Sequence, residues 1–229
     1  MKTIGLLGGM SWESTGLYYR KINEATKLAL GGLHSARIAM VSVDFSEIEA
    51  LQHAGDWAAC AELLSVNAQQ VEAAGADFLL ICTNTMHKVA TEIETAIDIP
   101  LLHLADATAA RIIAAGHKTV GLLGTRFTME EDFYRGRLQQ HGLEVIVPDR
   151  DDRQVVHKVI YDELCVGQIH DSSREAFIKI IHKLGNAGAH CVIEGCTEIT
   201  MLVQSDHIDI PLFDTTEIHA EEAVSLALR

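Results

Sequence analysis

A hydroxyl and a thiol occupy matching positions in two similar stretches of this sequence. Residues 74–85 read AGADFLLICTNT and residues 187–198 read AGAHCVIEGCTE, so that Thr83 corresponds to Cys196. A thiol exchanges protons readily, whereas a threonine hydroxyl is a much weaker acid and needs a neighbouring base or a water to activate it. In both stretches an apolar run comes first, so we expect each group to lie in the turn that follows a buried strand.

These stretches belong to a longer internal repeat. Residues 3–8 (TIGLLG) return as residues 119–124 (TVGLLG), and IPLLH at 99–103 returns as IPLFD at 210–214. The three pairs occur in the same order, with offsets of 116, 113 and 111 residues. A series of this kind predicts a chain built of two related halves.

Each half is expected to alternate strands with helices. The apolar runs do not alternate with polar residues, which is typical of parallel strands buried on both faces. Leu64, Ala68 and Val71 have helical spacing between two such runs, and Gly75 and Gly188 follow the predicted helices as C-terminal stops. The predicted fold class is α/β, with two pseudo-symmetric Rossmann-like or flavodoxin-like halves, each a parallel sheet flanked by helices.

We place residues 1–103 and the C-terminal helix, 215–229, in the first half, and residues 104–211 in the second. Ligands of open parallel sheets bind outside the carboxyl ends of the strands, where Thr83 and Cys196 both fall. A pseudo-two-fold relation between the halves would set these groups on opposite sides of a molecule bound in the cleft between them.

Composition excludes several classes of function. The net charge of −14 argues against nucleic acid and anionic membranes as partners, and no apolar stretch approaches the length of about 20 residues that spans a bilayer. The five cysteines are scattered without C-x-x-C spacing, and the histidines form no H-x-x-x-H pattern, so we expect a cytoplasmic protein without a metal site. GLLGG lacks the spacing of a nucleotide fingerprint, and we expect no cofactor.

The whole chain resembles the aspartate/glutamate racemases that work without pyridoxal phosphate. Those enzymes have a C-N-T turn in one half and G-C-T in the other, and this sequence has TNT at 83–85 and GCT at 195–197. GLLGG near the start, GLLGT at 121–125 and ELCVG at 163–167 are similar to cleft-lining segments of the family. The first turn therefore departs from the family because Thr83 stands in place of a cysteine.

The resemblance implies a racemase that inverts the α-carbon of a free amino acid by two-base proton transfer. Two opposed groups are needed because one face of the carbon loses a proton while the other face gains one. Thr83 and Cys196 are the implied catalytic pair. We expect Cys196 to form a thiolate readily at the start of a helix. The predicted substrate contacts are Met10, Ser11, Gln52, Asn84, Thr85, Thr125, Cys165, Thr197 and Glu198.

The substrate is less well defined by the resemblance. Family members specific for acidic substrates bind the side-chain carboxylate with an Arg and a Lys, but the loop at 44–57 (DFSEIEALQHAGDW) has neither, and Cys165 stands at the lysine's place. Aspartate or glutamate and a neutral polar amino acid such as homoserine all stay possible. Gln52 is either a substrate contact or a solvated surface side chain, and His87 either tunes a thiol or caps a helix.

Two other functions stay open. A decarboxylase of the arylmalonate type on the same scaffold uses a single cysteine to protonate a carbanion, and a non-catalytic amino-acid binder would retain the cleft without turnover. The family resemblance also suggests a homodimer that takes a small amino-acid substrate.

Overall fold

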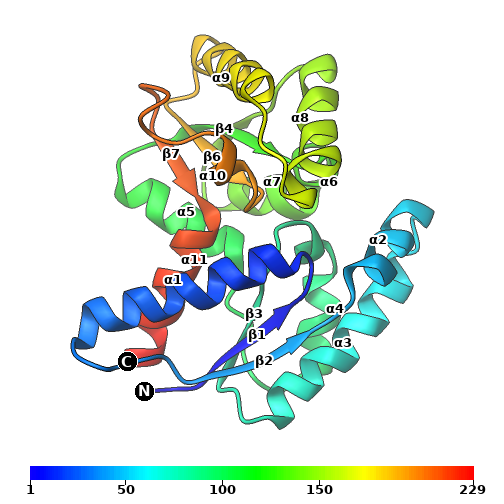
Figure 1. Ribbon diagram of the computed structural model, residues 1–229, viewed down its shortest axis with the longest axis vertical. Coiled ribbons are helices and arrows are strands. Elements are labelled where there is room, and N and C mark those ends of the chain that lie inside the picture. Colours follow the sequence, from blue (N-terminus) through cyan, green and yellow to red (C-terminus); the bar gives the residue numbers. More distant parts are fainter. The chain divides into compact units, whose positions relative to one another are not determined.

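The protein forms two compact α/β units, each with a parallel sheet of its own (Figure 1). The computed structural model describes residues 1–229. The first unit comprises Met1–Leu104 and His219–Arg229, and the second comprises Ala105–Ile218.

The first unit alternates strands and helices as its apolar runs predict. Its elements are β1 (Ile4–Gly8), α1 (Trp12–Leu30), β2 (Ile38–Ser42), α2 (Phe45–Ala54), α3 (Trp57–Ala73), β3 (Phe78–Ile81), the short 3-10 helix η1 (Thr85–Val89), α4 (Ala90–Ala96) and the greater part of α11 (Thr215–Leu228). The strands pair in parallel in the order β2-β1-β3. A parallel bridge between Leu79 and Leu101 extends this order by one position beyond β3.

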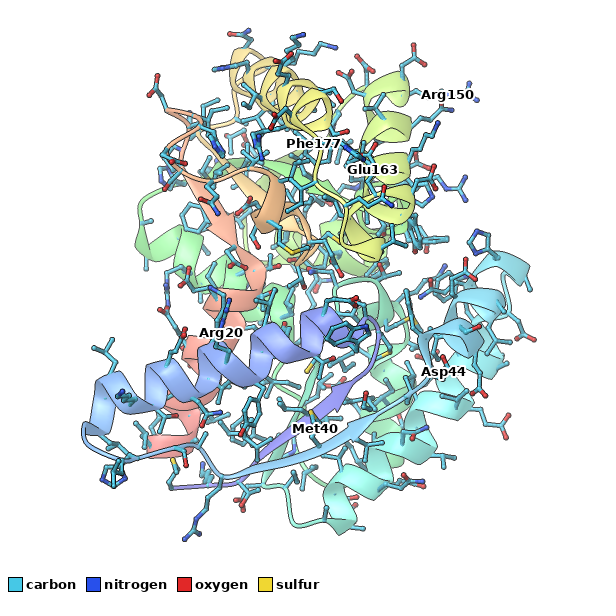
Figure 2. All side chains as sticks on the ribbon, in the orientation of Figure 1. Arg20, Met40, Asp44, Arg150, Glu163 and Phe177 are labelled. Carbon is cyan, nitrogen blue, oxygen red and sulfur yellow. The ribbon has the colours of Figure 1, made fainter.

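Polar side chains cap the starts of two of these helices, and a glycine follows the end of a third. Ser11 accepts a hydrogen bond from the Ser14 amide at the start of α1, and Asp44 (labelled in Figure 2) accepts one from Ser46 at the start of α2. At the other end, α3 stops at Ala73 and the chain turns through Gly75, whose φ of 90° favours glycine. The helix predicted from Leu64, Ala68 and Val71 is α3, and its predicted stop at Gly75 is confirmed.

The second unit repeats this plan. Its elements are α5 (Leu104–Ala114), β4 (Thr119–Gly124), α6 (Arg126–Glu130), α7 (Asp132–Gln140), β5 (Glu144–Ile146), α8 (Arg150–Asp162), η2 (Leu164–Val166), α9 (Asp171–Asn186), β6 (Cys191–Gly195), α10 (Ile199–Leu202) and β7 (Leu212–Asp214). The four strands are parallel in the order β5-β4-β6-β7. Figure 1 shows α8 and α9 on one side of this sheet and α5 and α7 on the other.

The repeat seen in the sequence is a repeat of topology. The central strands β1 and β4 come from the TIGLLG and TVGLLG segments, and β3 and β6 from the two AGA segments. Strands β3 and β6 each pair in parallel with the central strand of their own sheet. On the other side of β3 lies Leu101, and on the other side of β6 lies β7. The two-sheet α/β fold class predicted from the sequence is therefore correct.

Each sheet has a core packed against one of its faces. In the first unit, Leu7, Leu79 and Ile81 pack with the apolar faces of α3 and α4. In the second, Leu123 and Val192 pack with α8, α9 and α10, and Phe177 (labelled in Figure 2) is completely buried there. Burial of such apolar surface is the main stabilising contribution to each unit. None of the helices combines the length and the apolar character that crossing a bilayer requires.

Candidate active site

The first group of predicted site residues lies at the carboxyl end of the three-stranded sheet. Gly8 ends β1 and leads to Met10 and Ser11, and Ile81 ends β3 and leads to Thr83. Because Leu7 pairs with Ile81 in parallel register, these two turns leave the same edge of the sheet side by side. The structure thus brings Met10, Ser11, Thr83, Asn84 and Thr85 to one edge of the first unit.

The turn after β1 requires glycine. Gly9 has a φ of 94°, and a Cβ there would lie 2.2 Å from the Val43 carbonyl oxygen. Its amide donates to Thr15 Oγ1 at 2.8 Å, and the same hydroxyl donates to the Ser11 carbonyl at 2.9 Å. These bonds fix the backbone of the Gly8–Ser11 turn beside the start of α1.

Thr83 lies in a turn held by its backbone. The Ser14 hydroxyl donates to the Cys82 carbonyl at 2.9 Å, and His87 Nδ1 lies 2.8 Å from the Thr83 carbonyl oxygen. The Thr83 hydroxyl makes no hydrogen bond within the chain, and its residue is partly exposed. Cys82 is completely buried, and burial raises the pKa of its thiol well above the usual value, so it is a core residue as expected.

Gln52 lies inside the protein, not on the surface. The residue is 4% exposed, and its Nε2 donates to the sulfur of Met86 at 2.8 Å. Since Met86 follows Thr85 in η1, this contact places α2 against the turn that contains Thr83. The reading of Gln52 as a solvated side chain is wrong because a tertiary contact, invisible in the local sequence, turns it inward.

His87 caps a helix, which is one of the two roles expected for it, but the helix is α5 and not the one in which His87 lies. Its ring is 2% exposed and connects the Thr83 carbonyl to the amide of Leu104, the first residue of α5, at 3.3 Å. The His87 side chain therefore links the turn that contains Thr83 to the first residue of α5, which comes 17 residues after His87, and does not cap the helix in which it lies.

The second group of predicted site residues lies at the corresponding edge of the four-stranded sheet. Gly124 ends β4 and leads to Thr125, and Gly195 ends β6 and leads to Cys196. Gly124 and Gly195 are register partners, and a Cβ on Gly195 would lie 2.6 Å from the Leu123 carbonyl oxygen. Glycine in this strand end lets the two backbones approach closely and sets Thr125 and Cys196 at adjacent strand ends.

Cys196 is paired with a carboxylate. Its Sγ donates to Glu198 Oε2 at 3.0 Å, and both residues are buried. Burial, the negative charge of Glu198 and the neighbouring Cys165 together raise the pKa of the thiol well above its usual value. The expectation of an easily formed thiolate is wrong, because α10 has only four residues and so a weak dipole, while burial and the carboxylate oppose ionisation.

Thr197 and Cys165, two other members of the second group, lie in the turn after β6 and in η2. Thr197 Oγ1 accepts a hydrogen bond from the Thr216 hydroxyl at 3.0 Å, and the Thr215 hydroxyl donates to the Glu194 carbonyl at 2.9 Å. The start of α11 thus holds the end of β6. Cys165 lies in η2, close enough to Cys196 to affect its ionisation.

A hydrogen bond at the end of α8 fixes the segment that contains Cys165. Glu163 (labelled in Figure 2) accepts a hydrogen bond from the Ser173 hydroxyl of α9 at 2.6 Å. At the end of η2 the chain turns through Gly167, whose φ of 74° lies in the left-handed region. In the second unit, Thr197 and Glu198 follow Cys196 in the chain, Cys165 is near enough to affect the pKa of Cys196, and Thr125 follows the neighbouring strand.

Residues 7–223 match the Asp/Glu/Hydantoin racemase family, which is most of the chain. The chain belongs to this family. A curated relative, the broad specificity amino-acid racemase RacX of Bacillus subtilis, is 28% identical over 162 residues, which is 70% of this chain and 69% of RacX. The family and this relative are racemases, which are isomerases, and the name of the relative gives amino acids as its substrates.

Two solved structures extend the likeness over the entire chain. A crystal structure from Yersinia pestis, described provisionally as an Asp/Glu racemase, is 56% identical with a TM-score of 0.94, and the match covers 100% of both chains. PH1733 from Pyrococcus horikoshii OT3, an aspartate racemase homologue, is 31% identical with a TM-score of 0.87 and the same full coverage. The two-unit α/β fold of this family member is therefore the fold of aspartate racemase relatives.

Proposed function

We propose that this family member is a cofactor-independent amino-acid racemase in which Cys196 and Thr83 exchange the α-proton, each on its own face of the α-carbon. The observation that supports this best is topological: the two groups follow β6 and β3, which take the same place in sheets of the same strand order. Inversion needs a proton donor and a proton acceptor that are not on the same side of the carbon.

Glu198 is the proton acceptor for the thiol in this proposal. At rest Cys196 is a neutral thiol, since burial and Glu198 raise its pKa, and a neutral thiol cannot remove an α-proton. Transfer of the thiol proton to Glu198 Oε2, 3.0 Å away, creates a thiolate and a neutral carboxylic acid. The thiolate then takes the α-proton, and Thr83 supplies a proton to the other face, directly or through a water. Solvent reprotonates the oxygen left behind while Glu198 releases its proton, so the starting protonation states return.

Backbone and hydroxyl donors at the two strand edges would stabilise the carbanion. Its charge spreads onto the α-carboxylate, so donors aimed at that group lower the barrier most effectively. Asn84 and Thr85 in the first unit, Thr125 and Thr197 in the second, and the turn at Met10 and Ser11 are the groups proposed for this task. Each is nearly buried, which strengthens its hydrogen bonds to a bound anion.

We propose a neutral polar amino acid such as homoserine, or a broad range of amino acids, as the substrate. Gln52 offers a neutral amide, and Cys165, near enough to affect the pKa of Cys196, stands where the resemblance to racemases of acidic amino acids places a lysine that binds the side-chain carboxylate. The name of the B. subtilis relative, which describes broad specificity, agrees with this choice. Aspartate and glutamate are the alternative substrates.

The test is α-proton exchange measured by proton NMR in D₂O, together with chiral analysis, for both enantiomers of a panel of amino acids. Loss of the α-proton signal with inversion is expected for the wild type, and Cys196→Ala is expected to lose inversion. Turnover only of aspartate would refute the substrate proposal, and exchange without any optical change would refute the racemase proposal. Release of CO₂ from an arylmalonate without amino-acid turnover would support the decarboxylase alternative.

A homodimer in the cytoplasm stays a prediction. Size-exclusion chromatography with light scattering would test the oligomeric state: a mass near 50 kDa is expected for two copies of the 25.0 kDa chain.

A further inference from the structure

Two side chains hold consecutive carbonyl groups in the turn that presents Thr83. Ser14 of α1 donates to the Cys82 carbonyl, and the His87 ring contacts the Thr83 carbonyl oxygen at 2.8 Å. The direction in which a side chain leaves the backbone depends on the peptide units on either side of it. The direction of the Thr83 hydroxyl therefore depends on Ser14 and His87, which bind the neighbouring carbonyl groups and not the hydroxyl itself.

The partners of His87 define its tautomer. The Thr83 carbonyl can only accept, so Nδ1 must carry a proton, and the Leu104 amide can only donate, so Nε2 must be without one. His87 is thus a neutral imidazole with the proton on Nδ1. A protonated ring would lose its acceptor, and the opposite tautomer would match neither partner.

Neighbouring histidines restrict the ring of His87. The ring centroids of His103 and His219 lie 4.5 Å and 6.1 Å away, both in edge-on contacts. His219 is itself fixed, with Nε2 at 2.8 Å from the Leu102 carbonyl and Nδ1 at 2.9 Å from the Tyr18 hydroxyl. A ring flip of His87 would therefore disturb a buried and fully bonded neighbour.

We infer that His87 is a positioning residue for the proton transfer at Thr83: it fixes the Thr83 peptide group, and through it the hydroxyl, without contacting the substrate. The inference rests on the proposed racemase function, in which Thr83 serves one face of the α-carbon. Errors in placement of about 1 Å cost on the order of 10²-fold in rate. A substitution of His87 is therefore expected to slow proton transfer only on the face of the α-carbon that Thr83 serves.

Replacing His87 by asparagine or by glutamine tests its two hydrogen bonds separately. The Nδ2 of His87→Asn takes the place of Nδ1 and keeps a donor for the Thr83 carbonyl, whereas His87→Gln extends to the position of Nε2 and loses that donor. We expect kcat of His87→Gln to fall by about 10²-fold, with at least a tenfold smaller loss in His87→Asn and little change in KM for either variant. Equal losses in both variants would overturn the inference.

Exchange in D₂O identifies the face that is damaged. In the proposed mechanism Cys196 replaces the α-proton of one enantiomer by solvent deuterium with retention. The other enantiomer loses its α-proton on the Thr83 side, to the Thr83 oxygen or to a water bound to it, after that oxygen has given its own proton to solvent. His87→Gln should slow exchange of the second enantiomer and preserve exchange of the first. An equal decrease for both enantiomers would show a general structural effect and overturn the inference. If the wild type exchanges neither enantiomer of any amino acid, the proposed function fails as well.

A measurement on the unmodified protein does not depend on activity or on the folding of a variant. The imidazole ¹⁵N shifts of His87 should show a protonated Nδ1 and a bare Nε2 at neutral pH. A proton on Nε2, or an imidazolium, would overturn the inference even if the racemase assays succeed.

Discussion

Replacing Glu198 by glutamine removes the carboxylate that accepts the hydrogen bond of the Cys196 thiol at 3.0 Å. The side chain keeps its size, but it can no longer take up the thiol proton. A positioned acid-base group contributes about 10²- to 10⁴-fold to the rate, which corresponds to about 3 to 5 kcal/mol of transition-state stabilisation. We therefore expect Glu198→Gln to lower kcat by that factor.

The same variant should make the thiol more acidic. The charge of Glu198 and its hydrogen bond both raise the pKa of Cys196, so their removal lowers that pKa. Alkylation by iodoacetamide follows the thiolate fraction, and peptide-resolved mass spectrometry isolates Cys196 from the other cysteines. The pH at which this peptide is half-maximally alkylated should decrease while turnover also decreases.

A more acidic thiol together with slower turnover distinguishes the loss of a proton acceptor from other effects of the substitution. A variant that only disturbs the fold would expose Cys196 and lose activity, and it would also have a lower melting temperature. Glu175→Gln is the matched control, because it removes the same charge from an exposed position on α9 in the same unit. Faster turnover in Glu198→Gln, or an alkylation midpoint that moves to higher pH, would refute the role of Glu198 as proton acceptor.

Three further predictions concern single positions. Thr83→Cys should increase kcat measured by polarimetry, because a thiol is a stronger acid than a hydroxyl; a slower variant would show that Thr83 is adapted to another task. Gly195→Ala should destabilise the protein by about 1 to 3 kcal/mol in urea unfolding, since the new methyl group would lie 2.6 Å from the Leu123 carbonyl oxygen; an unchanged midpoint would contradict that contact. Burial and the neighbouring histidine lower the pKa of His219 to about 3, so the unfolded state binds this proton first and stability should decrease as pH falls from about 6.5 towards 3. His219→Gln should reduce that slope by up to about 1.4 kcal/mol per pH unit, and an identical acid profile in both proteins would argue against it.

Local signals in the sequence were sufficient to predict the fold class. Apolar runs without alternation gave the buried parallel strands, and Gly75 and Gly188 marked the ends of α3 and α9 because both residues adopt a positive φ. The repeat added long-range information, since equivalent segments form strands at equivalent positions in the two sheets. The sequence alone therefore places Thr83 and Cys196 at strand ends.

Protonation and side-chain direction could not be predicted in the same way. The helix-start argument for Cys196 considered only its own segment, whereas burial and Glu198 determine the direction of its pKa shift. Gln52 is polar and lies in a helix with exposed residues, but its side chain turns towards Met86, 34 positions later. His87 depends on Leu104, which lies in another element. Each of these properties arises from contacts between segments that are distant in sequence.

The path of α11 has a consequence for the order in which the protein folds during translation. The second unit is contained within Ala105–Ile218, but the first unit needs His219–Arg229, whose Ala227 carbonyl accepts the amide of Lys2 and whose His219 contacts Tyr18. These residues leave the ribosome after the second unit. The amino-terminal unit therefore cannot reach its final hydrogen-bonded state until His219–Arg229 have emerged, and nascent chains that end near residue 218 should mature in their second unit alone.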